Sequence, residues 1–191
     1  MRRAVFLDRD GVINRKAAEG DYIKSWSEFE ILPGVVSSIK RLNEEGFLVI
    51  VISNQRCVAR GIITEDELNE IHEKMKEELA KKGAIIDDIY YCPHDIKDRC
   101  DCRKPQPGLI LGAAKKYNID LDQSWVVGDS VSDVEAGKRS GCRTVLVGKY
   151  EFGSCEEFKP DITADSLAGA VDQILGKSTG VAKVLGSHLE S

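Results

Sequence analysis

Short apolar runs alternate with segments of helical periodicity along most of the chain. The runs lie at residues 2–8, 47–53, 86–92, 124–129 and 143–148, and a shorter one begins at residue 161. Apolar side chains recur at helical spacing in residues 33–46, 64–83, 107–118 and 132–141, and again before residue 175. Strands that are apolar throughout and separated by helices form a parallel sheet with helices on both faces. We therefore expect an α/β fold of this kind.

Two of the expected helices carry recognisable ends. Pro33 stands near the start of the first helix and Gly46 at its end, which is the usual placement of these two residues. Thr64 is followed three residues later by Glu67, which is the pattern of a capping box. The second helix is therefore expected to begin beside Thr64 and to run toward Gly83.

The bulk composition is that of one ordinary domain and excludes several classes of protein. A chain of 191 residues suits a single domain, expected at residues 1–178, with a flexible tail or an appended tag at residues 179–191. The formal net charge of −5 argues against nucleic acid as a partner. No apolar run approaches the roughly 18 residues that cross a membrane, and the N-terminus lacks the apolar stretch of a signal peptide. We expect a cytoplasmic protein, monomeric by default, with no membrane partner.

Acidic side chains gather where the expected strands end. Asp8 ends the first run and Asp10 follows two residues later, while Asp129 and Asp133 follow the run at 124–129. In parallel sheets the carboxyl ends of the strands meet along one edge, which is where ligands bind. Carboxylates this close repel each other unless a cation or a reaction requires them, and Mg²⁺ prefers oxygen ligands. A lone Asp-x-Asp at a strand end is also a common turn and helix cap. The other residues expected at this edge therefore determine whether the pair is functional or structural.

A hydroxyl and a lysine are expected at the same edge. Ser53 ends the second run, and Lys104 lies in the loop "CRKPQPG". Together with the carboxylates they supply a nucleophile, an acid, a metal site and positive charge for phosphate oxygens. This combination of groups favours phosphoryl transfer to or from a small phosphorylated substrate.

Four soft ligands are spaced as in a structural zinc site. The segment "YCPHDIKDRCDCRKP" places Cys92, His94, Cys100 and Cys102 as C-x-H, five residues, then C-x-C. Two disulfides or free thiols are the alternatives, although C-x-C pairs are too tight for easy disulfides. We expect structural Zn²⁺ here, in a loop that also carries Arg103 and Lys104. The remaining cysteines, Cys57, Cys142 and Cys155, are expected to be packing or surface thiols. The remaining histidines, His72 and His188, have no ligand-like neighbours in the sequence.

The motifs "DRDG", Ser53, Lys104 and "GDSVSD", in this order and at strand ends, resemble those of the haloacid dehalogenase superfamily of phosphohydrolases. The resemblance covers nearly the whole chain and implies a Rossmann-like parallel sheet. It implies that Asp8 is the nucleophile, that Asp10 is the general acid and base, and that Asp129 binds catalytic Mg²⁺ with Asp8 and the carbonyl of Asp10. It further implies that Ser53 and Lys104 hold the phosphoryl group and that Asp133 supports the site.

The spacing of the motifs leaves no room for the large cap domain that many members of this superfamily carry. A capless site would be open and ringed by residues 15–30, by residues 55–61 and by the zinc-binding loop. These loops would then recognise the substrate. The expected substrate contacts are Arg9, Glu19, Tyr22, Asn54, Gln55, Arg60 and Arg103.

Three segments resemble one capless subgroup in particular. They are "DYIKSWSEFEILPGV", "NQRCVARG" and "CDCRKPQPG", although Arg56 and Cys57 replace the usual Ser-Gly of that subgroup and Ser130 replaces a usual lysine. The resemblance implies hydrolysis of a sugar bisphosphate, D-glycero-D-manno-heptose 1,7-bisphosphate, at C7. Histidinol phosphate or another small phosphomonoester is the alternative substrate. A phosphotransferase or mutase and a non-catalytic zinc scaffold are the alternatives from other classes.

Overall fold

The computed structural model describes residues 1–148 and 159–176 of the chain. Its strands form one parallel sheet in the order β3-β2-β1-β4-β5-β6, which confirms the expected α/β fold. The proposed tail at residues 179–191, Cys155 and His188 lie outside the described residues. The strands are β1 (Ala4–Leu7), β2 (Leu48–Asn54), β3 (Asp88–Cys92), β4 (Trp125–Gly128), β5 (Arg143–Val147) and β6 (Ile162–Ala164).

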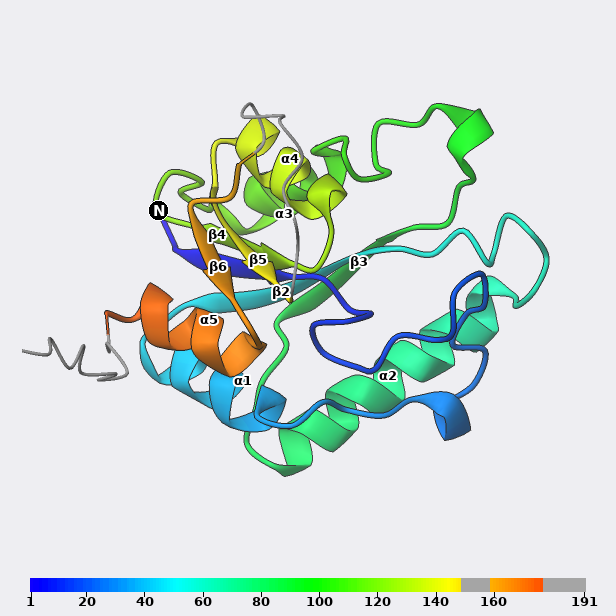
Figure 1. Cartoon of the computed structure of the whole chain (residues 1–191), viewed down its shortest axis with the longest axis horizontal. Helices are drawn as coiled ribbons and strands as arrows, with labels where there is room; N and C mark the ends of the chain where they lie inside the picture. The colour runs from blue at the N-terminus through cyan, green and yellow to red at the C-terminus, as the bar shows by residue number, and fades with distance from the viewer. Residues whose placement is uncertain (149–158, 177–191) are drawn as a thin grey trace, which may run out of the picture.

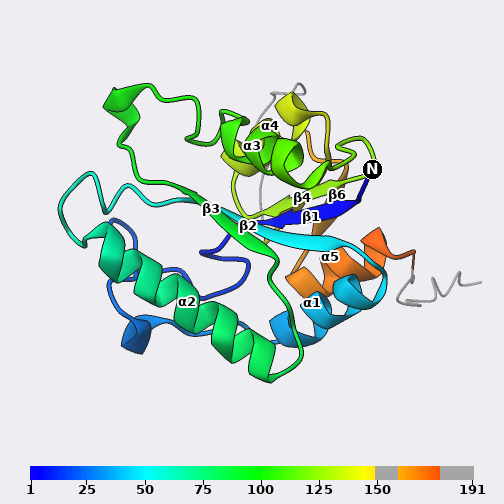
Figure 2. The same cartoon turned by 180° about the vertical axis from the view of Figure 1, so that it is seen from behind.

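Helices cover both faces of the sheet (Figures 1 and 2). One layer contains α1 (Val35–Glu44), α2 (Glu65–Lys81) and α5 (Leu167–Ile174), and the other contains α3 (Gly108–Tyr117) and α4 (Val131–Ser140). Each helix lies within a few residues of its expected position, and Thr64 and Glu67 form the predicted capping box of α2. Two short 3-10 helices, η1 (Trp26–Glu28) and η2 (Ile96–Asp98), were not expected. Within the described ranges, no helix combines the length and the apolar character needed to span a membrane.

The central strands are buried on both faces, which explains why they read as continuous apolar runs. In β1, Val5 and Leu7 pack in the cluster that contains Ile39 of α1, whereas Ala4 and Phe6 pack in the cluster that contains Ile110 of α3. Side chains alternate between the two faces of a strand, so each run supplies two cores at once. Such strands tolerate polar residues mainly at their ends.

The strand order reverses next to β1, which pairs with β2 on one side and with β4 on the other. In open parallel sheets the crevice at such a switch point, at the carboxyl ends of the strands, is where ligands bind. The chain leaves β1 at Asp8, β2 at Asn54 and β4 at Gly128, so these ends are neighbours. The loops that follow β1, β2 and β3 extend from one side of the molecule, in blue, cyan and green at the right of Figure 1.

Candidate active site

The turn after β1 holds Asp8 and Asp10 in place through its own backbone. The N–H of Asp8 donates to the carbonyl of Val127 in β4 (2.9 Å), and the carbonyl of Arg9 accepts from the N–H groups of Ile13 and Asn14. Gly11 adopts a φ of +95°, a conformation that favours glycine, and a Cβ there would collide with the carboxylate of Asp129. The glycine of "DRDG" therefore allows the β1 turn and the β4 acid to approach closely.

Three carboxylates meet at this point, and one ammonium group contacts two of them. Oxygens of Asp8, Asp129 and Asp133 all lie within 4.8 Å of one another. Lys104 donates from Nζ to Asp8 Oδ1 (2.8 Å) and to the carbonyl of Ile52 (3.0 Å), and it forms an ion pair with Asp133 Oδ1 (2.6 Å). The sequence motifs named these four side chains, and the structure brings them together.

Burial sets the charge state of this cluster. Burial raises the pKa of Asp8 to about 7; the charge of Lys104 opposes the rise, and those of Asp133 and Asp129 add to it. Burial also raises the pKa of Asp129, against its ion pair with Lys16. Burial alone would lower the pKa of Lys104, but Asp133 and Asp8 raise it. Crowded acids with raised pKa values form a donor set of hard oxygens that a divalent cation would stabilise.

Asp10 has the opposite surroundings, although it lies two residues from Asp8. Its carboxylate accepts hydrogen bonds from Arg9 (2.9 Å from Nη2), from Asn14 Nδ2 (2.9 Å) and from Gln55 Nε2 (2.9 Å). Burial would raise the pKa of Asp10, but the Arg9 guanidinium and these amides hold it below its usual value. Gln55 Nε2 also donates to Ser53 Oγ (2.7 Å), so it links the acid to the hydroxyl at the end of β2.

Arg9 is buried rather than displayed to solvent. Its side chain is 1% exposed, and its guanidinium lies between Asp10 and the imidazole of His72 in α2, with 3.2 Å between Nη1 and Nε2. Burial, followed by the charge of Arg9, lowers the pKa of His72 to about 3, so the ring is neutral and accepts this hydrogen bond. The structure thus assigns Arg9 a direct contact with Asp10.

Asn54 joins the end of β2 to the loop that carries Lys104. Its side chain accepts from the N–H of Lys104 (3.0 Å) and donates to the carbonyl of Lys104 (3.0 Å). Arg103, the preceding residue, donates to the carbonyl of His94 (3.3 Å). The loop is therefore tied to the strand on one side and to the cysteine segment on the other.

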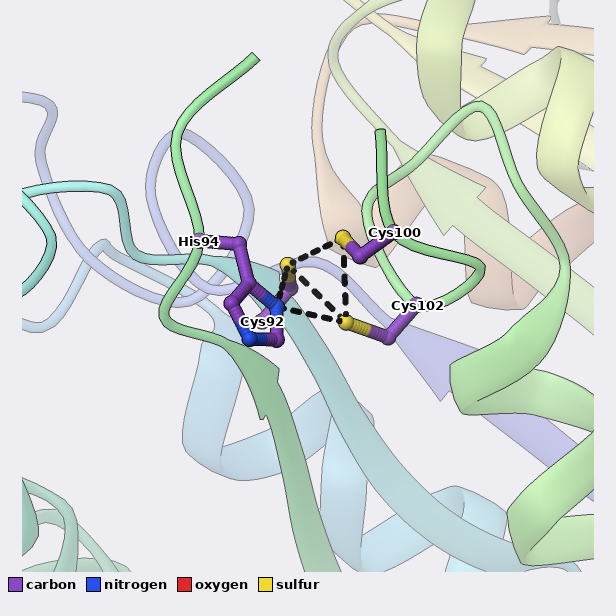
Figure 3. A group of neighbouring side chains, drawn as sticks. All are labelled: Cys92, His94, Cys100 and Cys102. Carbon is purple, nitrogen blue, oxygen red and sulfur yellow. Dashed lines mark hydrogen bonds between the residues drawn. The ribbon is translucent and has the colours of Figure 1, made fainter. Parts of the chain in front are cut away.

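The four expected zinc ligands converge at the end of β3 (Figure 3). The sulfur atoms of Cys92, Cys100 and Cys102 lie 3.1–3.5 Å apart, and His94 Nδ1 lies 3.3 Å from Cys102 Sγ and 3.6 Å from Cys92 Sγ. These separations exceed a disulfide bond of about 2.05 Å and approach those around one tetrahedral Zn²⁺. Burial raises the pKa of Cys92, and burial with hydrogen bonding to Cys92 raises that of Cys102. A cation would relieve this crowding of thiol groups.

Two hollows flank the carboxylate cluster, and Asn54 lines both. The first, of about 370 Å³, is lined by Asp10, Gln55, Arg56 and residues 16–23, which include the expected contacts Glu19 and Tyr22. The second, of about 600 Å³, is lined by Arg103, Lys104 and residues of the cysteine segment. Arg60 lines neither hollow; it pairs with Asp95 at 3.2 Å and so connects the loop after β2 to the cysteine segment.

Four side chains at the site were not expected from the sequence. Asn14 donates to Asp10, Lys16 pairs with Asp129, Arg56 lines the first hollow and His72 supports Arg9. A signal for His72 was available, because it falls on the buried stripe of α2 with Leu68, Ile71, Met75 and Leu79. The other three depend on how the loops fold, and no periodicity marks them.

Comparisons with known proteins agree with this geometry. The family described as HAD-hydrolase-like matches residues 101–170. D-glycero-beta-D-manno-heptose-1,7-bisphosphate 7-phosphatase of Rhodopseudomonas palustris is 43% identical over 147 residues, which cover 73% of this chain and 80% of that protein. D-glycero-alpha-D-manno-heptose-1,7-bisphosphate 7-phosphatase of Mycobacterium bovis is 38% identical over 169 residues, which cover 85% of this chain and 86% of that protein.

A solved structure extends the agreement to three dimensions. The D,D-heptose 1,7-bisphosphate phosphatase of B. bronchiseptica, complexed with magnesium and phosphate, superposes with a TM-score of 0.83 and 35% identity. The match covers 92% of this chain and 99% of that one. Identity above 30% over most of the relatives' length, with the same fold and a matching hydrolase family, shows that the chain belongs to the heptose-1,7-bisphosphate 7-phosphatase family of HAD-like hydrolases.

Proposed function

We propose that this chain is a magnesium-dependent phosphatase that converts D-glycero-D-manno-heptose 1,7-bisphosphate into heptose 1-phosphate and phosphate. The proposal rests on the names of the relatives and on one observation above all: Asp8, Asp129, Asp133 and Lys104 meet at the switch point of the sheet. In this proposal a single catalytic domain spans residues 1–178 and acts in the cytoplasm as a monomer, without nucleic acid or membrane partners.

The carboxylate cluster fits a magnesium ion. Asp8 and Asp129, with the backbone carbonyl of Asp10, would hold it, and Asp133 would support them from the start of α4. The donor set consists of hard oxygens, and burial, together with the neighbouring acids, raises the pKa of Asp8 and of Asp129, so a cation would stabilise their charged forms. When bound, Mg²⁺ supplies positive charge to the phosphoryl oxygens and to the nucleophile.

The proposed reaction has two steps, the first of which transfers the phosphoryl group to Asp8. An oxygen of Asp8 attacks phosphorus while the bond to the sugar oxygen breaks, and Asp10 donates its proton to that oxygen. Lys104 and Ser53 hold the phosphoryl oxygens during the transfer, because Lys104 contacts Asp8 and the carbonyl of Ile52, and Ser53 follows Ile52 at the carboxyl end of β2. The products of this step are the free sugar hydroxyl and an aspartyl phosphate.

The second step returns Asp8 to its starting form. Asp10, now a carboxylate, takes a proton from a water molecule, whose oxygen attacks phosphorus as the bond to Asp8 breaks. Phosphate leaves and Asp10 again carries a proton. The hydrogen bonds from Arg9, Asn14 and Gln55 stabilise the carboxylate form of Asp10 that this step requires.

We further propose that Cys92, His94, Cys100 and Cys102 hold a structural Zn²⁺. Three thiols and one imidazole form the closed donor set of structural zinc sites. The loop leads directly into Arg103 and Lys104, so the ion would fix the position of both cations. Its role is therefore to order the loop, and the reacting groups remain separate from it.

A comparison of two phosphate esters tests the proposed substrate. Heptose 1,7-bisphosphate should be hydrolysed at C7 with a kcat/KM at least about tenfold above that of histidinol phosphate, a difference of roughly 1.4 kcal/mol in transition-state binding. Release of phosphate with Mg²⁺ present measures both rates. Equal rates, or a preference for histidinol phosphate, would contradict the proposed substrate but would leave the proposed phosphatase chemistry unchanged. Absence of phosphate release from every ester would instead favour the non-catalytic alternative.

A further inference from the structure

We propose that His72 is a positioning residue for the general acid and base, and that it acts on Asp10 through Arg9. His72 comes from α2 and lines neither of the two hollows beside the carboxylate cluster, so its action does not require contact with the substrate. The inference rests on the proposed function and deepens it, because it names a further residue on which proton transfer to the leaving group depends.

The three side chains form one continuous chain of hydrogen bonds. Arg9 Nε donates to Asp10 Oδ2 at 3.2 Å, and Arg9 Nη2 donates to Oδ1 at 3.1 Å and to Oδ2 at 2.9 Å. The remaining guanidinium nitrogen, Nη1, lies 3.2 Å from His72 Nε2. An arginine side chain has no acceptor, so Nη1 is the donor of this bond and Nε2 is the acceptor.

Burial makes the bond from Arg9 to His72 important for the orientation of the guanidinium. Arg9 is 1% exposed and His72 is 3% exposed, so water is a poor alternative partner for either group. Among the described residues, His72 is the hydrogen-bond partner that the structure gives to Nη1. Without Nε2, Nη1 would be a buried donor with no partner, which is costly enough to draw the guanidinium away from Asp10.

A neutral acceptor suits residue 72 better than a charged group. A carboxylate there would compete with Asp10 for the positive charge of Arg9, and a cation would repel the guanidinium. Burial, followed by the charge of Arg9, lowers the pKa of His72 to about 3, so the imidazole is neutral near neutral pH. His72 therefore orients Arg9 and leaves the charge of the guanidinium to its ion pair with Asp10.

The result for Asp10 is a fixed carboxylate. Arg9 binds both of its oxygens, while Asn14 donates to Oδ1 and Gln55 donates to Oδ2. The side chain is still 28% exposed, so it can exchange a proton with the substrate. General acid catalysis depends on hydrogen-bond geometry, and a displacement of about 1 Å can cost about 100-fold in rate.

Two esters with different leaving groups test this role. A sugar phosphate such as heptose 1,7-bisphosphate needs a proton on its leaving oxygen, whereas acetyl phosphate releases acetate, a stable anion that needs none. His72→Leu removes the acceptor and should lower kcat/KM at least about tenfold for the sugar phosphate and less than about threefold for acetyl phosphate. His72→Gln keeps a neutral acceptor and should retain at least about half of the wild-type ratio of the two values.

Two controls separate positioning from packing. Leu79→Ala, on the buried stripe of α2, should lower thermal stability and leave the ratio of the two kcat/KM values unchanged. In an Arg9→Met background, His72→Leu should no longer change that ratio, because the residue through which His72 acts is absent. Equal losses for both esters in His72→Leu, a full loss in His72→Gln, or additive effects in the double variant would overturn the proposal.

Two further measurements keep the test decisive if His72→Leu does not fold. His72→Met matches the length of glutamine and has only a weak acceptor, so it should show the same selective loss as His72→Leu. Nitrogen NMR of wild type, whose chain has three histidines, should show His72 Nε2 without a proton near neutral pH. A proton on Nε2 would overturn the proposal, since that nitrogen could not then accept from Arg9.

The same experiment separates this inference from the proposed function. If wild type prefers another sugar phosphate, only the substrate assignment fails, and the two leaving groups are compared with that ester instead. If wild type hydrolyses heptose 1,7-bisphosphate and a folded His72→Leu variant keeps the wild-type ratio, the function stands and the role of His72 is refuted. Thermal unfolding of each variant shows whether the substitution preserves the fold.

Discussion

At the scale of single residues, Asp8 and Asp10 share a turn, but their pKa values are shifted in opposite directions. Burial raises the pKa of Asp8 to about 7, while Arg9 and two amides hold the pKa of Asp10 below its usual value. The proposed reaction needs the reverse, an ionised nucleophile and a protonated acid. Asp8 ionises more readily once a divalent cation joins the cluster, and Asp10 gains affinity for a proton beside a phosphate dianion. Binding of metal and substrate would thus set the protonation that the first step requires.

The nucleophile gives the first prediction. Asp8→Asn should reduce turnover below about one per cent of wild type, because loss of a covalent nucleophile costs several orders of magnitude in rate. Phosphate release with saturating Mg²⁺ measures this loss. Asp122→Asn, an exposed acid before the amino end of β4, is the matched control and should retain full activity. Substantial turnover by Asp8→Asn would show that another group attacks phosphorus.

His72 gives a prediction about stability and pH. Its pKa is about 3 in the folded protein and about 6.5 when unfolded, so between these values the unfolded chain binds a proton that the folded chain does not. Stability should therefore fall as the pH drops below 6.5, by about 2 kcal/mol at pH 5 from this group. His72→Gln lacks the titration, so wild type should lose about 2 kcal/mol more than the variant between pH 7.5 and 5. Urea unfolding at the two pH values measures the difference, and equal losses would contradict it.

The sequence predicted the reacting groups better than the groups that hold them. Asp8, Lys104, Asp129 and Asp133 follow apolar runs or a recognisable motif, and parallel strand ends must meet. Asn14 and Arg56 have no such marker, because their positions depend on turns whose path is set by tertiary contacts. Arg9 was expected at the substrate; it lines the first hollow, and its guanidinium also binds Asp10, a contact that only the folded turn reveals.

At the scale of elements, the loop between β3 and α3 contrasts with the rest of the fold. The strands and long helices were predictable because their apolar periodicity reflects the core. This loop contains only the 3-10 helix η2, whose three residues are too few to show periodicity, and Ile96 within it is 64% exposed. With so little apolar burial, the loop needs another source of order, and its four clustered ligands can supply it.

Zinc removal tests that account. Purified protein should contain about one Zn²⁺ per chain. Mild EDTA dialysis should stop turnover, and addition of Mg²⁺ alone should restore it. Cys100→Ser should lower zinc content and thermal stability, and it should reduce kcat/KM because Arg103 and Lys104 lose their support. Cys142→Ser, a buried thiol outside the cluster, should retain its zinc. Recovery that depends on Zn²⁺ instead of Mg²⁺ would show that the roles of the two metals are reversed.

At the scale of the whole molecule, the site exists only when the sheet is assembled. Its groups come from the ends of β1, β2 and β4 and from the loop after β3, so the site joins four segments that are far apart along the chain. The same assembly forces acids together: burial raises the pKa of both Asp8 and Asp129, which means that their negative charge disfavours folding in the absence of a cation. The arrangement of the acids therefore strengthens metal binding and lowers the stability of the metal-free protein.

This conflict predicts opposite effects of one substitution on stability with and without metal. Mg²⁺ at about 100 times its Kd should stabilise wild type by about 2.7 kcal/mol, or roughly 5–10 °C in Tm for a chain of this length. Asp129→Asn removes one crowded charge and one metal ligand, so its metal-free Tm should exceed that of wild type while the shift with Mg²⁺ disappears. Thermal unfolding at pH 8, above the pKa of about 7 of Asp8, with and without Mg²⁺ measures both effects. A lower metal-free Tm for Asp129→Asn would show that the ion pair of Asp129 with Lys16 outweighs the repulsion among the three acids.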